Sequence, residues 1–222
     1  MTRAANAIVD WDAIDTVLVD MDGTLLDLAF DNFFWRELVP QRYAEQHGMS
    51  VQAAQTALAP RFAAKVGTLD WYCLDHWTRD LGMNLKTLKR EYREHIRYLP
   101  GAREFLAAVR ARGKRLSIVT NAHRDTFAVK AEHTGLDKLV DAIVSSHDFA
   151  APKESAAFWL ALERHAPFDG LRTLLVEDNL TVLAAARAHG VRHTIAIRRP
   201  DSREPPRAIG DFVGVDGVFE LV

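Results

Sequence analysis

The stretch VLVDMDGTLLD, Val17 to Asp27, places two carboxylates two residues apart at the end of an apolar run, with a Gly-Thr pair directly after them. Like charges this close disfavour each other's ionised form, and an isolated carboxylate is costly to bury. Asp20 and Asp22 therefore need water at a loop or a positive charge beside them. The stretch predicts a buried strand whose carboxyl end opens onto a charged site.

Apolar runs like the one before Asp20 recur along the chain, and helical patterns separate most of them. Several are rich in Val and Ile and do not strictly alternate, which is typical of strands buried on both faces of a parallel sheet. Glycine directly follows three of the helical segments, where a helix C-terminus favours a left-handed residue. Repeated strand–helix units predict an α/β fold with a doubly wound, Rossmann-like parallel sheet of strand order 3-2-1-4-5. The expected strands are 16–19, 115–119, 142–145, 173–176 and 193–197, and the expected helices are 102–112, 126–134, 155–165 and 181–189.

The segment 28–98 breaks this alternation, because it contains helical patterns and no good strand candidate. Connections between a strand and the next helix are usually about 2–6 residues long. The simplest interpretation is a helical cap domain, residues 28–98, inserted after the first strand. The core domain then consists of residues 1–27 and 99–222, with a polar, Pro-rich loop at 198–206 before the C-terminal tail.

Composition limits the classes of partner. The 222 residues include 28 basic and 30 acidic side chains, a formal charge of −2, so nothing favours a nucleic-acid or membrane partner. Cys73 is the only cysteine, which excludes an intramolecular disulfide and a zinc site built from several cysteines. The N-terminal stretch MTRAANAIVDWDAID lacks the apolar core of a signal peptide, and no apolar run reaches the ~18 residues of a membrane span. We therefore expect a soluble, cytoplasmic protein, and the sequence leaves its oligomeric state open.

Polar side chains follow four of the expected strands, where each strand ends or in the loop after it. Ligands of doubly wound sheets bind beyond the carboxyl ends of the strands, which meet at one edge. Each group has an ordinary explanation by itself: a helix cap, a solvated surface charge, or an acid at the favourable start of a helix. Their presence at all of these positions predicts one shared site. The residues are Asp20 and Asp22, Thr120 and Asn121, Lys153, and Glu177 and Asp178.

Four short motifs carry a family resemblance. DMDGT, VTN, PK and VEDN stand in the order and spacing of the haloacid dehalogenase-like (HAD) phosphohydrolases, which this chain resembles over nearly its whole length. The helical insertion also sits where that family places its first cap. The fourth motif has Glu177-Asp178 instead of the commoner Gly-Asp or Asp-Asp, a form also seen in β-phosphoglucomutase-like members. The resemblance implies a phosphomonoester hydrolase that acts through an aspartyl-phosphate.

The resemblance also implies a role for each polar residue, and it answers the question of the two aspartates. A hard divalent cation prefers oxygen ligands, so Mg²⁺, with Mn²⁺ or Co²⁺ as substitutes, would neutralise the acids and a phosphate together. Its expected ligands are the side chains of Asp20, Glu177 and Asp178 and the backbone carbonyl of Asp22. Asp20 is the expected nucleophile and Asp22 the general acid and base. The phosphate is expected to contact Thr120, Asn121, Lys153 and amides around Gly23.

Asp22 also separates two reaction types within the family. A dehalogenase needs the first carboxylate but no acid for an alkoxide leaving group. The second aspartate therefore favours hydrolysis of a phosphate ester.

The substrate is expected to be chosen by the segment 28–98, which is rich in aromatic residues. These aromatics have an ordinary explanation as the core of the cap, and an aromatic wall can also stack a nucleobase. The stretches DMDGTLLDLAFDN, TNAH, AVKAEHTGLD and PKE resemble the branch of the superfamily that acts on GMP and IMP. This resemblance implies a purine 5′-mononucleotide substrate, with five candidate contacts: Asn32, Arg36, Trp71, Tyr72 and His123.

Two alternatives stay open beside this hypothesis. The same chemistry suits another small phosphorylated metabolite, such as a sugar phosphate or phosphoglycolate. A catalytically silent regulatory binder is the second alternative, but such a chain would usually lack Asp20 or Asp22, and here every chemical position is filled.

Overall fold

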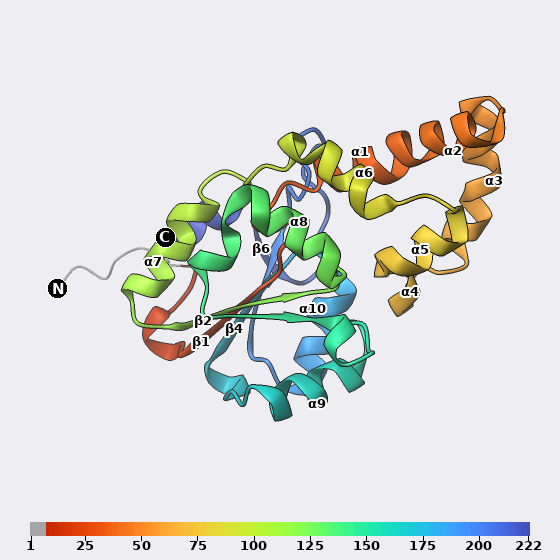
Figure 1. Cartoon of the computed structure of the whole chain (residues 1–222). Coiled ribbons are helices and arrows are strands. Elements are labelled where there is room, and N and C mark those ends of the chain that lie inside the picture. Colours follow the sequence, from red (N-terminus) through yellow and green to blue (C-terminus); the bar gives the residue numbers. More distant parts are fainter. Residues whose placement is uncertain (1–7) are drawn as a thin grey trace.

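The computed structural model describes residues 8–222 (Figure 1); residues 1–7, part of the N-terminal stretch and of the expected core domain, lie outside the described residues. One parallel sheet has the strand order β3-β2-β1-β4-β5-β6. The predicted α/β class and the order 3-2-1-4-5 are confirmed. The strands are β1 (Thr16–Val19), β2 (Arg115–Thr120), β3 (Ala142–Ser145), β4 (Thr173–Glu177), β5 (His193–Ile197) and β6 (Val213–Val215).

The edge strand β6 was not predicted from the sequence. It has three residues with a central glycine, Val-Gly-Val, which is too short to stand out as an apolar run. A Cβ at Gly214 would lie 2.1 Å from Ile209 and 3.1 Å from the backbone oxygen of Ala196. Glycine therefore lets this edge strand approach its neighbours.

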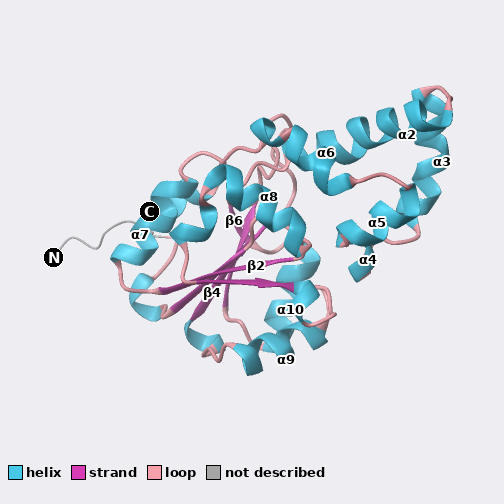
Figure 2. Cartoon of the chain, viewed as in Figure 1, coloured by secondary structure: helices cyan, strands magenta, loops and turns pink. Residues whose placement is uncertain are grey.

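Helices cover both faces of the sheet (Figure 2). Side chains of a strand alternate between the two faces, so Val17 and Val19 join one apolar cluster and Leu18 joins the other. The first cluster includes residues of α7 and α8, and the second includes residues of α9 and α10. The bounds are α7 (Ala102–Ala111), α8 (Arg124–Thr134), α9 (Ala156–His165) and α10 (Leu180–His189).

Strand register brings the expected site together. Val19 is aligned with Ile118 of β2 on one side and with Val176 of β4 on the other. The amide of the next residue, Asp20, donates to the carbonyl of Val176 at 2.9 Å. The acids that follow β1 and β4 therefore lie side by side at the carboxyl edge of the sheet.

The segment between β1 and β2 is helical, as expected, and in Figure 1 its orange and yellow helices extend away from the sheet. Its first helix, α1 (Ala29–Phe33), continues through a π-helical turn, Phe34–Leu38, into α2 (Val39–His47). Gly48, with φ of 63°, ends this long helix in the left-handed conformation that favours glycine. The division of the chain into a cap, 28–98, and a core stays a prediction. The remaining helices are α3 (Val51–Ala63), α4 (Leu69–Tyr72), α5 (Leu74–Leu81) and α6 (Leu85–Glu91), with short 3₁₀ turns at Trp11–Ala13, Arg93–His95, Leu136–Leu139, Ser146–Asp148, Gly170–Arg172 and Val218–Leu221.

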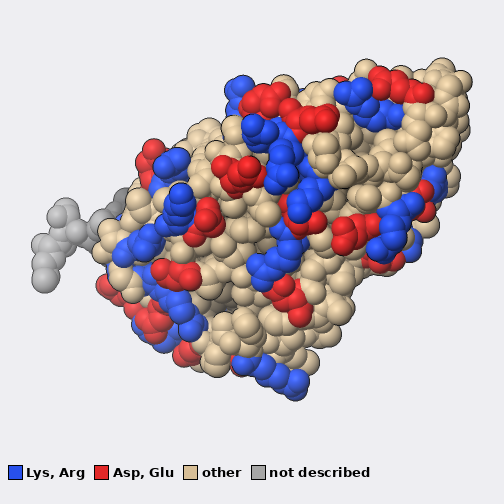
Figure 3. All heavy atoms as spheres, in the orientation of Figure 1, with Lys and Arg blue, Asp and Glu red and all other residues tan. Residues whose placement is uncertain are grey.

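The surface carries both signs of charge. Figure 3 shows basic and acidic side chains interspersed across the visible face. Among residues 8–222, no helix combines the length and the apolar composition needed to cross a bilayer.

Candidate active site

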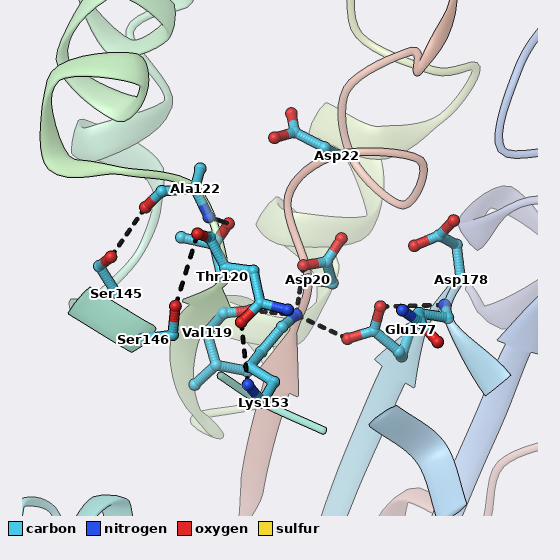
Figure 4. A network of polar contacts seen from close by, with 12 residues as sticks. Asp20, Asp22, Val119, Thr120, Ala122, Ser145, Ser146, Lys153, Glu177 and Asp178 are labelled. Carbon is cyan, nitrogen blue, oxygen red and sulfur yellow. Dashed lines mark hydrogen bonds and ion pairs between the residues drawn. The ribbon is translucent and has the colours of Figure 1, made fainter. Parts of the chain in front are cut away.

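Lys153 is the centre of the polar network at the carboxyl edge of the sheet (Figure 4). Its ammonium group donates to Asp20, to Glu177 at 2.7 Å and to the backbone oxygen of Val119 at 3.0 Å. Lys153 is 1% exposed and Glu177 is 1% exposed. A buried lysine that pairs with two buried carboxylates holds both at fixed positions.

One lysine does not balance the acids around it. Burial, together with the neighbouring Glu177, raises the pKa of Asp20 to about 8. Burial also raises the pKa of Glu177 to about 7, and burial with the Asp20 charge raises that of Asp178 to about 6. Conversely, Asp20 and Glu177 raise the pKa of Lys153 even though its own burial acts in the opposite direction. The three carboxyls therefore need further positive charge to be ionised together at neutral pH.

A divalent cation fits this donor set. Oxygen atoms of Asp20, Glu177 and Asp178 all lie within 4.8 Å of one another. Carboxylate oxygens are the ligands that Mg²⁺ prefers, and two of these three side chains are buried. The side chain of Asp22 points away from the three acids (Figure 4), which is consistent with its expected contribution through the backbone carbonyl.

Without a metal ion, the stability of the fold is expected to fall as the pH rises from about 5 to about 9. Asp20, with a pKa of about 8, holds its proton more tightly in the folded than in the unfolded state, and Glu177 and Asp178 do the same. Raising the pH through this window therefore favours unfolding. Mg²⁺ should raise the melting temperature more at about pH 8.5 than at about pH 5.5, because it competes with these protons. Thermal unfolding in EDTA and in excess Mg²⁺ measures both effects, and an equal Mg²⁺ effect at the two pH values would contradict the prediction.

Asp22 is bound by a different lysine. Lys130 of α8, 1% exposed, donates to Asp22 and to Asp31, and Lys89 of α6 donates to Asp31 at 2.8 Å. Burial raises the pKa of Asp22, although Lys130 acts in the opposite direction. The two lysines hold the pKa of Asp31 well below its ordinary value in spite of its burial. Asp22 therefore lies in a separate electrostatic environment from Asp20, in contact with Lys130 of α8, the helix that follows β2.

Gly23 forms part of the turn that directly follows Asp22. Its φ is +84°, and an added Cβ would lie 2.9 Å from Asp178 and 2.9 Å from Pro200. Its amide donates to the carbonyl of Leu26 at 2.7 Å. This amide is therefore already engaged, which differs from its expected contact with a phosphate, and Gly23 contributes through its backbone conformation.

Thr120 and Asn121 differ in their freedom to bind a ligand. The hydroxyl of Thr120 accepts from the amide of Ala122 at 3.0 Å, which leaves its own proton to donate. The side chain of Asn121 accepts from the amide of Lys153 and donates to Glu154, both at 2.9 Å. Asn121 thus positions the loop that carries Lys153, while Thr120 keeps a donor for a phosphoryl oxygen.

A cavity of about 620 Å³ lies between these residues and the helices of the insertion. Its volume is in the range of pockets for small molecules, roughly 300–1,000 Å³. The cavity unites most of the residues predicted from the sequence. Those that line it are Asp20, Asp22, Thr120, Asn121, Lys153, Glu177 and Asp178 from the strand ends, and Asn32, Arg36, Trp71 and Tyr72 from the insertion.

His123 is the predicted substrate contact that the structure does not bring to the cavity. One nitrogen of its ring accepts from the amide of Asp125 at 3.3 Å and so caps α8. The other nitrogen lies 3.7 Å from a carboxylate oxygen of Asp75. The loop after Asn121 turns the ring away from the cavity, a direction that adjacency in the sequence does not reveal.

The cap aromatics pack against each other and also form a wall of the cavity. The ring centroid of Trp77 lies 5.0 Å from that of Phe62 and 6.4 Å from that of Trp71, both edge to face. The indole N–H of Trp77 donates to the backbone oxygen of Trp71 at 2.9 Å. Trp35 joins the same cluster and lines the cavity. The same aromatic residues therefore pack the interior of the insertion and line the cavity.

Tyr72 connects the insertion to the strand ends through a residue that the sequence did not single out. Its hydroxyl donates to Glu154 at 2.6 Å, and Asn121 and Asn179 donate to the same carboxylate at 2.9 and 3.3 Å. Glu154 directly follows Lys153. The motif PKE contained it, but only the fold shows that it meets Tyr72.

Arg207 is a second residue that sequence reasoning missed. It directly follows the Pro-rich loop 198–206 and lines the cavity. It donates to the carboxylate of Asp178 at 3.1 Å and to the backbone oxygen of that residue. In the sequence it stands beside a polar loop, and a surface loop with no role in the site has the same composition.

The pair of Asp20 and Lys153 gives the sheet edge a buried carboxylate with its charge partner, an arrangement typical of enzymes. Comparison with known proteins identifies the class of enzyme. Residues 14–190 match the model of the haloacid dehalogenase-like hydrolases, and the chain belongs to this family of enzymes, as its four motifs predicted.

One relative by sequence and two proteins of similar structure show what this chain resembles. GMP/IMP nucleotidase YrfG of Escherichia coli (strain K12) is 40% identical over 194 residues, which cover 87% of this chain and 87% of that protein. The crystal structure of a HAD phosphatase from Thermococcus onnurineus has a TM-score of 0.79 at 20% identity, covering 94% of this chain and 96% of that one. An L-2-haloacid dehalogenase from Xanthobacter autotrophicus, with chloropropionic acid covalently bound, has a TM-score of 0.60 at 16% identity and the same coverage, 94% and 96%. The fold is thus shared by a phosphatase and a dehalogenase, and the reaction has to be argued from the site.

Proposed function

We propose that this enzyme hydrolyses phosphomonoesters through a phosphorylated Asp20, and that its substrates are purine 5′-mononucleotides such as GMP and IMP. The observation that carries the reaction type is the separation of the two aspartates. Asp20 pairs with Lys153 among the acids, and Asp22 is held apart by Lys130. One carboxylate is thus free to attack while the other exchanges protons.

In the first half of the reaction, an oxygen of Asp20 attacks phosphorus and the bond from phosphorus to the ester oxygen breaks. Asp22, whose pKa burial raises, gives its proton to the leaving alcohol. Lys153 and the hydroxyl of Thr120 stabilise the charge on the transferring group. A bound Mg²⁺ at Asp20, Glu177, Asp178 and the carbonyl of Asp22 would offset the charge of the phosphate beside these acids.

In the second half, a water molecule attacks phosphorus and Asp22, now a carboxylate, takes its proton. The bond between phosphorus and Asp20 breaks, which restores the carboxylate of Asp20 and leaves inorganic phosphate. Lys130 keeps Asp22 in place through both proton transfers, because it anchors the carboxylate from α8.

The purine preference is supported by two observations. The relative at 40% identity is named a GMP/IMP nucleotidase. The aromatic side chains that line the cavity include Trp35 and Trp71, and the polar Asn32 and Arg36 of the same insertion also line it. Aromatic faces can stack a base, and polar groups can select its edge. The single thiol, Cys73, suits a reducing compartment, so we place the proposed reaction in the cytoplasm.

A panel of substrates tests the reaction and the preference together. Release of inorganic phosphate is measured from nucleoside 5′-monophosphates, sugar phosphates and phosphoglycolate, each with Mg²⁺ and with excess EDTA. We expect the highest kcat/KM for GMP and IMP and no turnover in EDTA, since three carboxyls crowd the phosphate site. A preference for a sugar phosphate or phosphoglycolate would replace the purine assignment, undiminished turnover in EDTA would remove the metal from the proposal, and no turnover on any ester would favour the regulatory alternative.

Replacing Trp71 or Tyr72 by alanine is expected to raise KM for GMP more than KM for p-nitrophenyl phosphate. Stacking on an aromatic side chain contributes about 1–3 kcal/mol per base in single-strand binders, so a loss of roughly tenfold is expected by analogy. The matched control is Tyr43→Ala, because Tyr43 lies in α2 and does not line the cavity. Equal losses on both substrates with a lower melting temperature would show that Trp71 and Tyr72 only pack the insertion.

A further inference from the structure

Three metal-ligating side chains from separate segments meet outside the cavity. Cys73 lies between α4 and α5 of the insertion, His123 follows β2, and His147 lies in the 3₁₀ turn after β3. One ligand atom of each lies within 4.8 Å of the ligand atoms of the other two. None of the three lines the cavity that contains Asp20.

The hydrogen bonds of these residues leave a ligand atom of His147 available. The Nε2 atom of His147 is buried and has no hydrogen-bond partner among the described residues. His123 accepts from the amide of Asp125 at Nδ1, so in this tautomer its ring proton is on Nε2. Metal binding through Nε2 requires that proton to move to Nδ1, which ends the hydrogen bond that caps α8. Its ring meets that of His147 edge to face, with centroids 4.9 Å apart. A buried ring nitrogen without a partner costs free energy and requires an explanation.

A carboxylate lies beside one of the two imidazoles, because an oxygen of Asp75 is 3.7 Å from Nε2 of His123. Asp75 is not one of the three side chains whose ligand atoms lie within 4.8 Å of one another.

We propose that Cys73, His123 and His147 form a second metal site, which binds Zn²⁺ with a water molecule as the fourth ligand. Thiolate and imidazole ligands select a borderline metal such as Zn²⁺, whereas the carboxylates at Asp20 select a hard one. Zinc takes four ligands with Zn–S near 2.3 Å and Zn–N near 2.0–2.1 Å, so ligand atoms now within 4.8 Å need to close by about 1 Å. Binding releases the thiol proton of Cys73 to solvent.

The position of this site gives it a structural consequence. Cys73 belongs to the insertion, whereas His123 and His147 follow strands of the sheet. A metal bound by both groups ties the insertion to the sheet next to Tyr72 and Ala122, which line the cavity. The composition excluded only a zinc site made of several cysteines, and one cysteine with two histidines satisfies that limit.

The chain offers an unusually clean spectroscopic test because Cys73 is its only thiol. The probe is Co²⁺, titrated into the folded protein with Mg²⁺ in large excess. Carboxylate ligands give no thiolate-to-cobalt charge-transfer band, so any such near-ultraviolet band reports Cys73. We expect a band that saturates at one equivalent and disappears when Zn²⁺ is added.

Matched variants show whether the histidines take part. Cys73→Ser should remove the band and, since serine can still accept from the amide of His76 as Cys73 does at 3.4 Å, should retain the fold and the Mg²⁺-dependent activity. His147→Gln should raise the Kd for Co²⁺ at least roughly tenfold. Loss of a residue that only supports a metal ligand lowers metal affinity by about 10–100-fold, and loss of a ligand should cost at least as much. The control is His133→Gln, an exposed histidine of α8, which should bind as wild type.

Thermal unfolding adds a readout that needs no spectrum. Zn²⁺ at about 100 times its Kd should raise the ratio of folded to unfolded wild-type chain about 100-fold and leave that of Cys73→Ser unchanged. Absence of the band in the folded wild-type protein overturns the proposal, and that result requires no variant to fold. A band of unchanged affinity in His147→Gln, or equal stabilisation of wild type and Cys73→Ser by Zn²⁺, overturns it as well.

Discussion

Asp20→Asn is expected to abolish phosphate release from every ester that the wild-type enzyme hydrolyses. The amide of asparagine cannot form an acyl-phosphate, so the covalent route is closed at its first step. The expected loss exceeds that for any other single side chain, because the remaining groups only assist the transfer that Asp20 performs. Phosphate release under saturating Mg²⁺, followed long enough to detect slow turnover, is the measurement.

The loss should not come from unfolding. Asp20 is buried, and its pKa is raised to about 8 by burial and by Glu177, so its charge destabilises the metal-free fold above that pH. Asparagine keeps the volume and removes the charge. The melting temperature of Asp20→Asn in EDTA at about pH 9 should therefore equal or exceed that of wild type. Asp137→Asn, at an exposed position, is the matched control and should remain fully active.

A variant that retained turnover within roughly tenfold of wild type would mean that water attacks phosphorus directly. The phosphorylated enzyme gives an independent check. Wild-type protein quenched in acid during turnover should carry phosphate on the peptide that contains Asp20, and Asp20→Asn should carry none.

The order of the sheet could be predicted because strands and strand ends are local features of the sequence. The apolar run before Asp20 needs no distant residue to identify it, and parallel packing then places the ends of β1, β2 and β4 together. The edge strand β6 carried no such signal, because Val-Gly-Val is too short and its pairing depends on β5.

The network around Asp22 could not be predicted in this way. Asp31, Lys89 and Lys130 come from three helices, and each is a charged residue of a helical segment in which charged residues are common. Only the packing shows that Lys130 and Lys89 are buried and that both donate to Asp31. The position of His123 outside the cavity lining could not be predicted for the same reason, since the sequence does not give the direction in which a loop turns.

This network decides what the second aspartate can do. Asp22→Asn should leave the fold and Mg²⁺ binding largely intact, because the metal is expected to contact the backbone carbonyl of residue 22 and not its side chain. Asparagine can still accept a hydrogen bond from Lys130, and Asp31 keeps its two lysine partners. A change in rate can therefore be assigned to proton transfer.

The rate on GMP should fall roughly 10²–10⁴-fold in Asp22→Asn, the usual size of a general acid–base contribution. The fall should be smaller for the first half-reaction of p-nitrophenyl phosphate, whose leaving group departs as a stable anion without a proton. A rapid burst of p-nitrophenol followed by slow turnover is thus expected, since release of phosphate from Asp20 still needs a base for water. Single-turnover and steady-state rates on both esters measure this difference. If Asp22→Asn hydrolyses an alkyl phosphate at near the wild-type rate, Asp22 is not the acid, and the lysine-bound aspartate serves only to hold α8 against the turn after β1.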